Sequence, residues 1–118
     1  MSFHDLLNGL LSELDIPYYF EGSPELSDST PEAFIFYNVY DVPALRGCGE
    51  EFLTTYYVTV NVYTTGENKA QTADNIGTAL TTLLTENGFV RQSGSYGLTD
   101  DFPEYYHRII EFNYSREI

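Results

Sequence analysis

Residues 56–76 read YYVTVNVYTTGENKAQTADNI, and this stretch decides the fold. Its first eight residues alternate between two kinds of side chain, which is typical of a β-strand with two unlike faces. A turn at Gly66 follows, and residues 68–87 then carry apolar side chains at helical spacing until Gly88, which favours a helix stop. A strand that passes directly into a long helix predicts a domain of mixed α and β structure.

The two faces of this strand, which we expect over residues 52–64, differ in chemistry. Val58, Val60 and Val62 form one face, and we expect it to pack beneath the helices. The opposite face carries Tyr57, Thr59, Asn61 and Tyr63. This second face is neither charged enough for open water nor apolar enough for a core, so we expect a partner to cover it.

The remaining elements follow from the same patterns. We expect a helix over 2–14, strands over 18–22, 33–41 and 105–114, and a strand that begins at Phe89. Polar or glycine-containing connections are expected over 23–32, 42–51 and 93–104. The order α-β-β-β-α-β-β predicts one α+β domain over residues 1–118. It would be a two-layer sandwich, with a mostly antiparallel sheet and two helices on one face.

The two expected helices have distinct sequence signatures. Ser2, followed three residues later by Asp5, resembles a capping box at the start of the first helix. The second helix has an apolar stripe made of Ala73, Ile76, Ala79, Leu80, Leu83 and Leu84. Small residues such as Gly77 keep this helix slim, which favours close packing on a sheet.

Acidity is the strongest signal in the composition. The chain has 18 Asp and Glu against 5 Lys and Arg, a formal net charge of -13. A surface that grips phosphate needs cations, so this balance disfavours both nucleic-acid binding and adhesion to an anionic membrane. We also expect no transmembrane span and no signal peptide, because the apolar runs are short and the first residues lack a basic segment.

Aromatic side chains are the second unusual feature. Eleven Tyr and eight Phe make up 16% of the chain. Tyrosine suits surfaces that are exposed in a monomer and covered in an assembly, but aromatic residues are also favoured in any β-sheet. Composition alone leaves both interpretations open.

Residues able to support catalysis are sparse. His4 and His107 are expected to be structural or exposed, and Cys48 lies between two glycines near acidic residues that disfavour a reactive thiolate. As the only cysteine it forms no internal disulfide, which fits a reducing compartment. Asp100, Asp101 and Glu104 lack the spacing of a calcium loop, so whether they bind a cation stays open. We therefore expect no enzyme, no catalytic residue, no cofactor and no metal site.

Five segments of the chain carry a resemblance to a known family: the helix LLNGLLSEL, the strands AFIFYNVY and YYVTVNVYTT, the helix DNIGTALTTLLTENGF and the closing strand YHRIIEFNYSRE. With these segments the chain resembles the small tail-terminator and minor-capsid family of long-tailed bacteriophages. The resemblance implies a ring, commonly of six subunits, that caps the tail tube and joins it to the head connector. It implies no catalytic residues. It places the protein in the virion, assembled in the bacterial cytoplasm.

A closed ring requires two different contact patches on each subunit. The residues we expect at such interfaces are Arg46, Cys48, Tyr57, Thr59, Asn61, Tyr63, Tyr96 and Phe102. Expected partners are copies of the chain and other tail or head-connector proteins, while DNA would pass through an acidic lumen without specific binding. The alternatives are another head–tail adaptor, a tube-like subunit, or a small cytoplasmic ligand-binding module.

Overall fold

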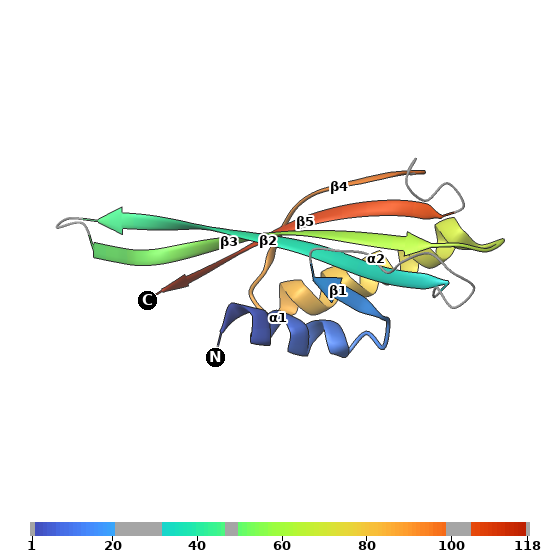
Figure 1. The fold of residues 1–118 in the computed structure, drawn as a ribbon. Coiled ribbons are helices and arrows are strands. Elements are labelled where there is room, and N and C mark those ends of the chain that lie inside the picture. The colour runs from blue at the N-terminus through green and yellow to red at the C-terminus, as the bar shows by residue number, and fades with distance from the viewer. Residues whose placement is uncertain (1, 21–31, 47–49, 99–104, 118) are drawn as a thin grey trace.

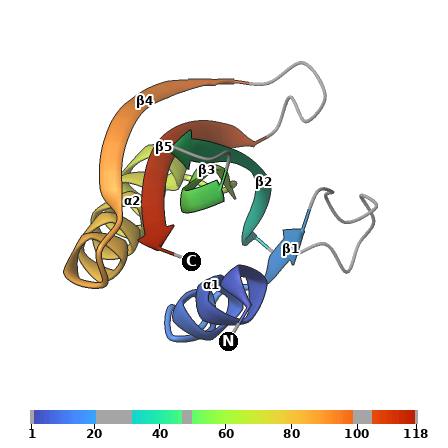
Figure 2. The same ribbon diagram turned by 90° about the vertical axis from the view of Figure 1, so that its left-hand side faces the viewer.

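The structure, a computed structural model, describes residues 2–20, 32–46, 50–98 and 105–117. These residues form α1 (Phe3–Ser12), β1 (Tyr18–Phe20), β2 (Ala33–Arg46), β3 (Glu50–Thr64), α2 (Lys69–Glu86), β4 (Val90–Leu98) and β5 (Tyr106–Glu117) (Figure 1). Both helices lie on the same side of one sheet (Figure 2). The expected element order and the α+β two-layer architecture are confirmed.

The described strands form a five-stranded sheet in the order β1-β2-β3-β5-β4. Three of its four strand pairs are antiparallel, and the short β1 is parallel to β2. The β2–β3 pair is the longest, because its register continues from Ala33 opposite Thr64 to Arg46 opposite Glu50. The sheet is therefore mostly antiparallel, as the sequence predicts.

The main core lies between the helices and the valine face of β3. Val58, Val60 and Val62 are each at most 1% exposed, which confirms the face predicted for them. The helices cover this face with Phe3, Leu7, Leu10, Leu11, Ile76, Leu80 and Leu84. At the start of α1, the backbone N–H of Asp5 donates to Oγ of Ser2 over 3.0 Å, which satisfies one of the unpaired N–H groups at a helix start.

The buried stripe of α2 differs in part from the prediction. Ala73, Ile76, Leu80 and Leu84 are buried, but Ala79 is exposed and Leu83 is only half-buried. Gly77 is buried in their place. The buried stripe therefore consists of Ala73, Ile76, Gly77, Leu80 and Leu84.

A buried cation beside α2 explains why position 77 is a glycine. Arg108 of β5 lies on the helix face of the sheet, is 6% exposed, and places its Nη1 3.7 Å from Oδ1 of Asp74. A Cβ on Gly77 would lie 2.0 Å from the same Nη1, so the glycine gives the guanidinium its room. The predicted slimness of α2 is therefore needed at one position and for one side chain.

The predicted connections 42–51 and 93–104 are too long, because the neighbouring strands extend into them. Residues 42–46 and 50–51 belong to the β2–β3 hairpin, and residues 93–98 belong to β4. Glycine and proline favoured loops there, but pairing with a neighbouring strand prevails over that local preference. Residues 47–49 and 99–104 lie outside the described part of the chain.

Pro43 fits within β2 because of the side to which its nitrogen points. The N–H of Ile35 donates to the carbonyl oxygen of Pro17, away from β3. Backbone groups of alternate residues point the same way along a strand, so those of Val39, Asp41 and Pro43 also point away from β3. The N–H that Pro43 lacks would have been on the outer edge, where proline is tolerated in sheets.

The β2–β3 hairpin gives the molecule its elongated shape, with extents of 56 × 26 × 24 Å. In Figure 1 it extends past α1 at one end of the molecule. We call its outer part, Tyr40–Arg46 with Glu50–Tyr57, the arm. The base of the arm is fixed to α1 because Tyr56 stacks on Phe3 with ring centroids 4.0 Å apart.

Candidate assembly surface

The sheet face opposite the helices, here called the open face, contains two regions with different exposure. One is an aromatic cluster near the start of β2, and the other lies at the base of the arm. All four side chains that the sequence predicts for this face do point away from the valine face, because Tyr57, Thr59, Asn61 and Tyr63 alternate with the valines along β3. Their exposure, however, differs from one to the next.

Tyr63 belongs to a second, smaller core and not to an accessible surface. It is 3% exposed and stacks on Phe34 with ring centroids 5.1 Å apart. Tyr105 meets Phe34 edge-on at 5.4 Å and completes the cluster. The prediction that Tyr63 lies outside the core is therefore wrong, because rings from β2 and from the residue just before β5 enclose it.

Asn61 is also unsuited to the predicted interface. It is 6% exposed, its Nδ2 donates to the carbonyl oxygen of Phe36 over 3.4 Å, and its Oδ1 lies 2.8 Å from Nε2 of His107. The contact with Phe36 fixes the orientation of the amide, so Nε2 of His107 is the donor to Oδ1. Both polar ends of Asn61 are thus used within the subunit.

His107 contributes more to this face than the sequence indicates. Its ring stacks on Tyr63 with centroids 4.2 Å apart and an interplanar angle of 12°. Burial lowers the pKa of His107 below its ordinary value, because the charged imidazolium loses hydration. The imidazole is thus held neutral and acts as a packing and hydrogen-bonding group. His107 lies opposite Tyr63 in the sheet, and Asn61 lies two residues before Tyr63 on β3, so finding this contact depends on knowing the strand register.

Tyr57 and Thr59 fit the predicted surface better than the other two. Both are partly exposed, and Tyr57 stacks on Tyr40 with ring centroids 5.0 Å apart and an interplanar angle of 14°. Tyr40 itself is 61% exposed. Sequence reasoning missed Tyr40, although its place opposite Tyr57 follows from the hairpin register.

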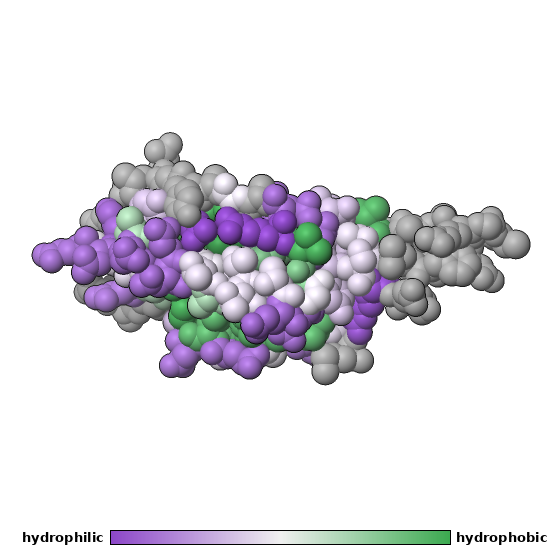
Figure 3. Space-filling view, turned by 180° about the vertical axis from the view of Figure 1, so that it is seen from behind, coloured by the Kyte–Doolittle hydropathy of each residue, from purple (hydrophilic) through white to green (hydrophobic). Residues whose placement is uncertain are grey.

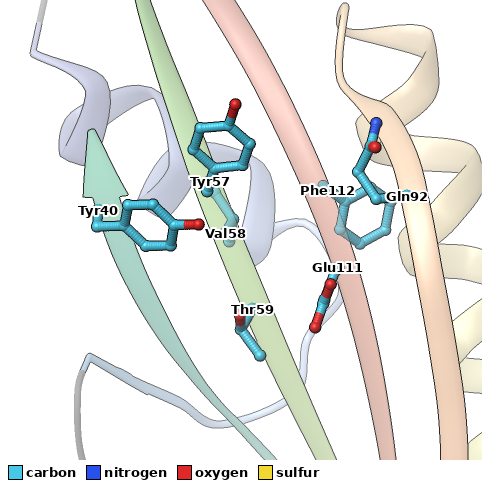
Figure 4. A pocket seen from close by; sticks show the side chains of 7 residues that line it. All are labelled: Tyr40, Tyr57, Val58, Thr59, Gln92, Glu111 and Phe112. Carbon is cyan, nitrogen blue, oxygen red and sulfur yellow. The ribbon is translucent and has the colours of Figure 1, made fainter. Parts of the chain in front are cut away.

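A hollow of about 170 Å³ opens beside this tyrosine pair. Its lining residues come from four neighbouring strands: Tyr40, Tyr57, Val58, Thr59, Gln92, Glu111 and Phe112 (Figure 4). In Figure 4 the Tyr40 ring extends from β2 toward β3, and Glu111 and Gln92 lie across the hollow on β5 and β4. The hollow thus has an aromatic side and a polar side with one carboxylate.

Other apolar side chains are exposed at scattered places. Val42 on the arm is 47% exposed and Val90 at the start of β4 is 56% exposed. Figure 3 shows hydrophobic residues in several separate areas between hydrophilic ones. The arm and the outer strand β4 thus each carry an accessible apolar residue.

The other predicted interface residues lie at the end of β2, in β4 or outside the described residues. Arg46 ends β2 opposite Glu50, and Tyr96 of β4 pairs with Arg108. Cys48 and Phe102 lie outside the described residues, as does the acidic group of Asp100, Asp101 and Glu104. Within the described ranges, no three His, Cys, Asp or Glu side chains lie together in a way that would hold a metal ion.

Comparisons with known protein families and with curated proteins found no match: no family model matches the chain, and no curated protein matches its sequence. Of the two helices in the described residues, neither has the length and apolar character that crossing a membrane requires.

Proposed function

We propose that this protein is a structural subunit of a long-tailed bacteriophage particle, and that it forms a ring that terminates the tail tube and joins it to the head connector. Its work would be contact with copies of itself and with other particle proteins, without catalysis or a cofactor. It would act in the virion after assembly in the bacterial cytoplasm. The choice of a phage ring among assembly proteins rests on the sequence resemblance.

The observation that carries this proposal is the outer edge of β2 from Val39 into the arm, with which no described strand pairs. Within the described part of the chain, β1 pairs with Ile35–Tyr37, and no strand pairs with the outer edge of β2 beyond them. Val39 and Asp41 direct their backbone N–H and C=O groups to that side. A strand edge of this kind readily pairs with a strand of another chain.

A second edge of suitable direction lies on the other side of the same sheet. β4 is the last strand of the sheet, and the three antiparallel pairs between β2 and β4 make it run opposite to β2. If the β4 edge of one copy met the arm of the next, the two strands would pair in antiparallel fashion. Such a contact joins two different patches, and repeated contacts of this kind form a ring when the rotation from one copy to the next closes a circle.

The charge of the chain fits passage of DNA through such a ring. A net charge of -13 repels phosphate, so a duplex would slide along an acidic lumen without specific binding. A head–tail adaptor or tube-like subunit would use the same edges toward different neighbours. A ligand-binding module is less well supported, since the hollow of about 170 Å³ is smaller than the several hundred Å³ typical of such pockets, and the larger space of about 390 Å³ beside Asp15 and Tyr18 is widely open to solvent.

Light scattering across a range of concentrations, together with negative-stain imaging, tests the proposal. We expect a mass that is a multiple of 13.4 kDa and images of rings or stacked rings. A particle that keeps the mass of one chain at every concentration would contradict the proposal. A twofold dimer would do so as well, because a twofold contact uses the same patch on both copies.

A further inference from the structure

We propose that the hollow beside Tyr40 and Tyr57 binds an arginine or lysine side chain presented by a neighbouring protein subunit. This inference rests on the proposed function, since it names the chemistry of a contact that the assembling subunit makes. Three observations carry it: the arrangement of the tyrosine rings, the carboxylate across the hollow, and the position of the hollow beside the free edge of the arm.

The tyrosine pair supplies the aromatic side of the site. Tyr40 and Tyr57 stack at 5.0 Å, so each ring covers one face of the other and keeps its outer face at the rim of the hollow. The face of a tyrosine ring carries partial negative charge and attracts a cation within about 6 Å of its centroid. A planar guanidinium also stacks on such a face, which makes arginine the better of the two ligands.

Glu111 supplies the charge on the opposite side. It lies in β5, is exposed, and lines the same hollow as the two tyrosines. A carboxylate has about four lone-pair positions, so Glu111 can accept a further hydrogen bond from a cation beside the contacts that it makes within the subunit. The Thr59 hydroxyl and the Gln92 amide oxygen add neutral acceptors around the hollow.

Charge complementarity selects the occupant. In a chain with a net charge of -13, a hollow that contains a carboxylate repels an anionic group. Its volume of about 170 Å³ suits the end of one side chain more than a drug-sized ligand. Arg108, one of the five basic residues, is buried under α2, so a neighbouring copy could not present this side chain to the hollow.

The position of the hollow connects it with the arm. Tyr40 lies on β2 next to Val39 and Asp41, whose backbone groups point to the outer edge. A strand paired on that edge would place alternate side chains on the open face, within about 5 Å of the β2 backbone. A long basic side chain from that strand would extend across Tyr40 toward Glu111, so strand pairing and cation binding would reinforce each other.

The test is a nuclear magnetic resonance titration of the isolated protein with N-acetylarginine amide as the probe. We expect saturable shifts at Tyr40, Tyr57, Thr59 and Glu111. The same titration with N-acetylcitrulline amide, which has nearly the same shape but no charge, should leave these signals unchanged. Equal shifts with both probes, or arginine shifts confined to other acidic surfaces, would overturn the inference.

Two variants identify the groups responsible. Glu111→Gln and Tyr57→Leu should each weaken binding about two- to fivefold, as expected for an exposed ion pair and a cation–π contact. Glu86→Gln, which makes the same charge change at the end of α2, is the matched control and should leave the affinity unchanged. Equal weakening by Glu86→Gln would show that net charge, and not the hollow, attracts the probe.

The titration does not depend on ring formation. Arginine binding without any assembly would support this site and contradict the ring. A neighbour's side chain would fill the hollow within a ring, so the titration is made at concentrations at which light scattering shows the single 13.4 kDa chain. Rings at higher concentration together with no selective arginine binding by the single chain would support the proposed function and overturn this inference.

Discussion

Gly77 of α2 lies directly over the guanidinium of Arg108, and a Cβ at this position would come within 2.0 Å of Nη1 and 2.6 Å of Cζ. The close approach lets α2 pack on β5 while the cation stays beside Asp74. A buried charge needs its partner, because removal of the partner leaves an uncompensated ion in a poorly hydrated place. The contact thus joins a helix to the strand next to the outer strand β4.

Gly77→Ala tests this contact. The added methyl group would displace the guanidinium from Asp74, and overpacking of this kind costs about 1–3 kcal/mol. We expect the free energy of unfolding to fall, even though alanine is the better helix former by about 1 kcal/mol. Gly9→Ala is the matched control, since no atom lies within 4 Å of a Cβ there. That variant should be more stable than the wild type, and urea unfolding measures both.

Substitutions in the arm test the free edge of β2. Asp41→Pro removes an N–H that points outward and should preserve the fold while lowering the measured mass to 13.4 kDa. Asp41→Ala removes the charge but keeps the N–H, so it should assemble. Tyr40→Pro removes an N–H directed at β3 and should destabilise the subunit itself. Light scattering and thermal unfolding distinguish these results, and rings formed by Asp41→Pro would argue against edge pairing.

Tyr63 and Tyr57 should respond differently to truncation. Tyr63→Ala removes a buried ring that stacks on Phe34 and His107, and such losses cost about 3–5 kcal/mol. Tyr57→Ala removes a partly exposed ring and should cost about 1 kcal/mol or less while weakening assembly. Denaturant unfolding gives the two stabilities. Similar losses at both positions would mean that the open face is uniformly packed.

The lowered pKa of His107 predicts how stability depends on pH. The unfolded chain binds a proton near pH 6.5, whereas the folded chain does so only at lower pH. Folding stability from this group is therefore fully present above that pH and is lost as the pH falls toward the folded pKa. His107→Gln, whose amide can still donate to Asn61, should lack this loss.

The change must be measured as a difference between proteins, since many carboxylates also titrate on acidification. Thermal unfolding from pH 7.5 to 5 should bring the wild type and His107→Gln progressively closer in stability, or reverse their order. His4→Gln makes the same substitution at an exposed residue of α1 and is the matched control for the loss of one histidine. A parallel course for His107→Gln would remove His107 as the cause.

Sequence patterns predict the local elements of this fold well. The alternation of Val58, Val60 and Val62, and the helical spacing of the leucines in α1, depend only on the period of each element. Strand lengths were harder to predict. The suitability of Pro43 for β2 depends on which side of the strand its nitrogen faces, and that is fixed by pairing with β1 and β3.

The candidate surface shows the same limit more clearly. Tyr57 and Tyr63 have the same residue type and the same strand parity, yet one lies at a hollow and the other is buried. The difference comes from their neighbours, which are Tyr40 on one side and Phe34 with His107 on the other. Burial of this kind requires the register between strands that are distant in the sequence.

Pro43 also bears on how firmly two copies could hold each other. It interrupts the row of outward N–H groups just after Asp41, so a strand that joins the arm finds only a few rungs before the ladder stops. If copies join through this edge, a single junction would be held by few backbone hydrogen bonds, and two copies that meet in solution would soon separate. A closed circle, in which every copy is held on both sides, would persist, so incomplete arcs would be rare beside finished circles.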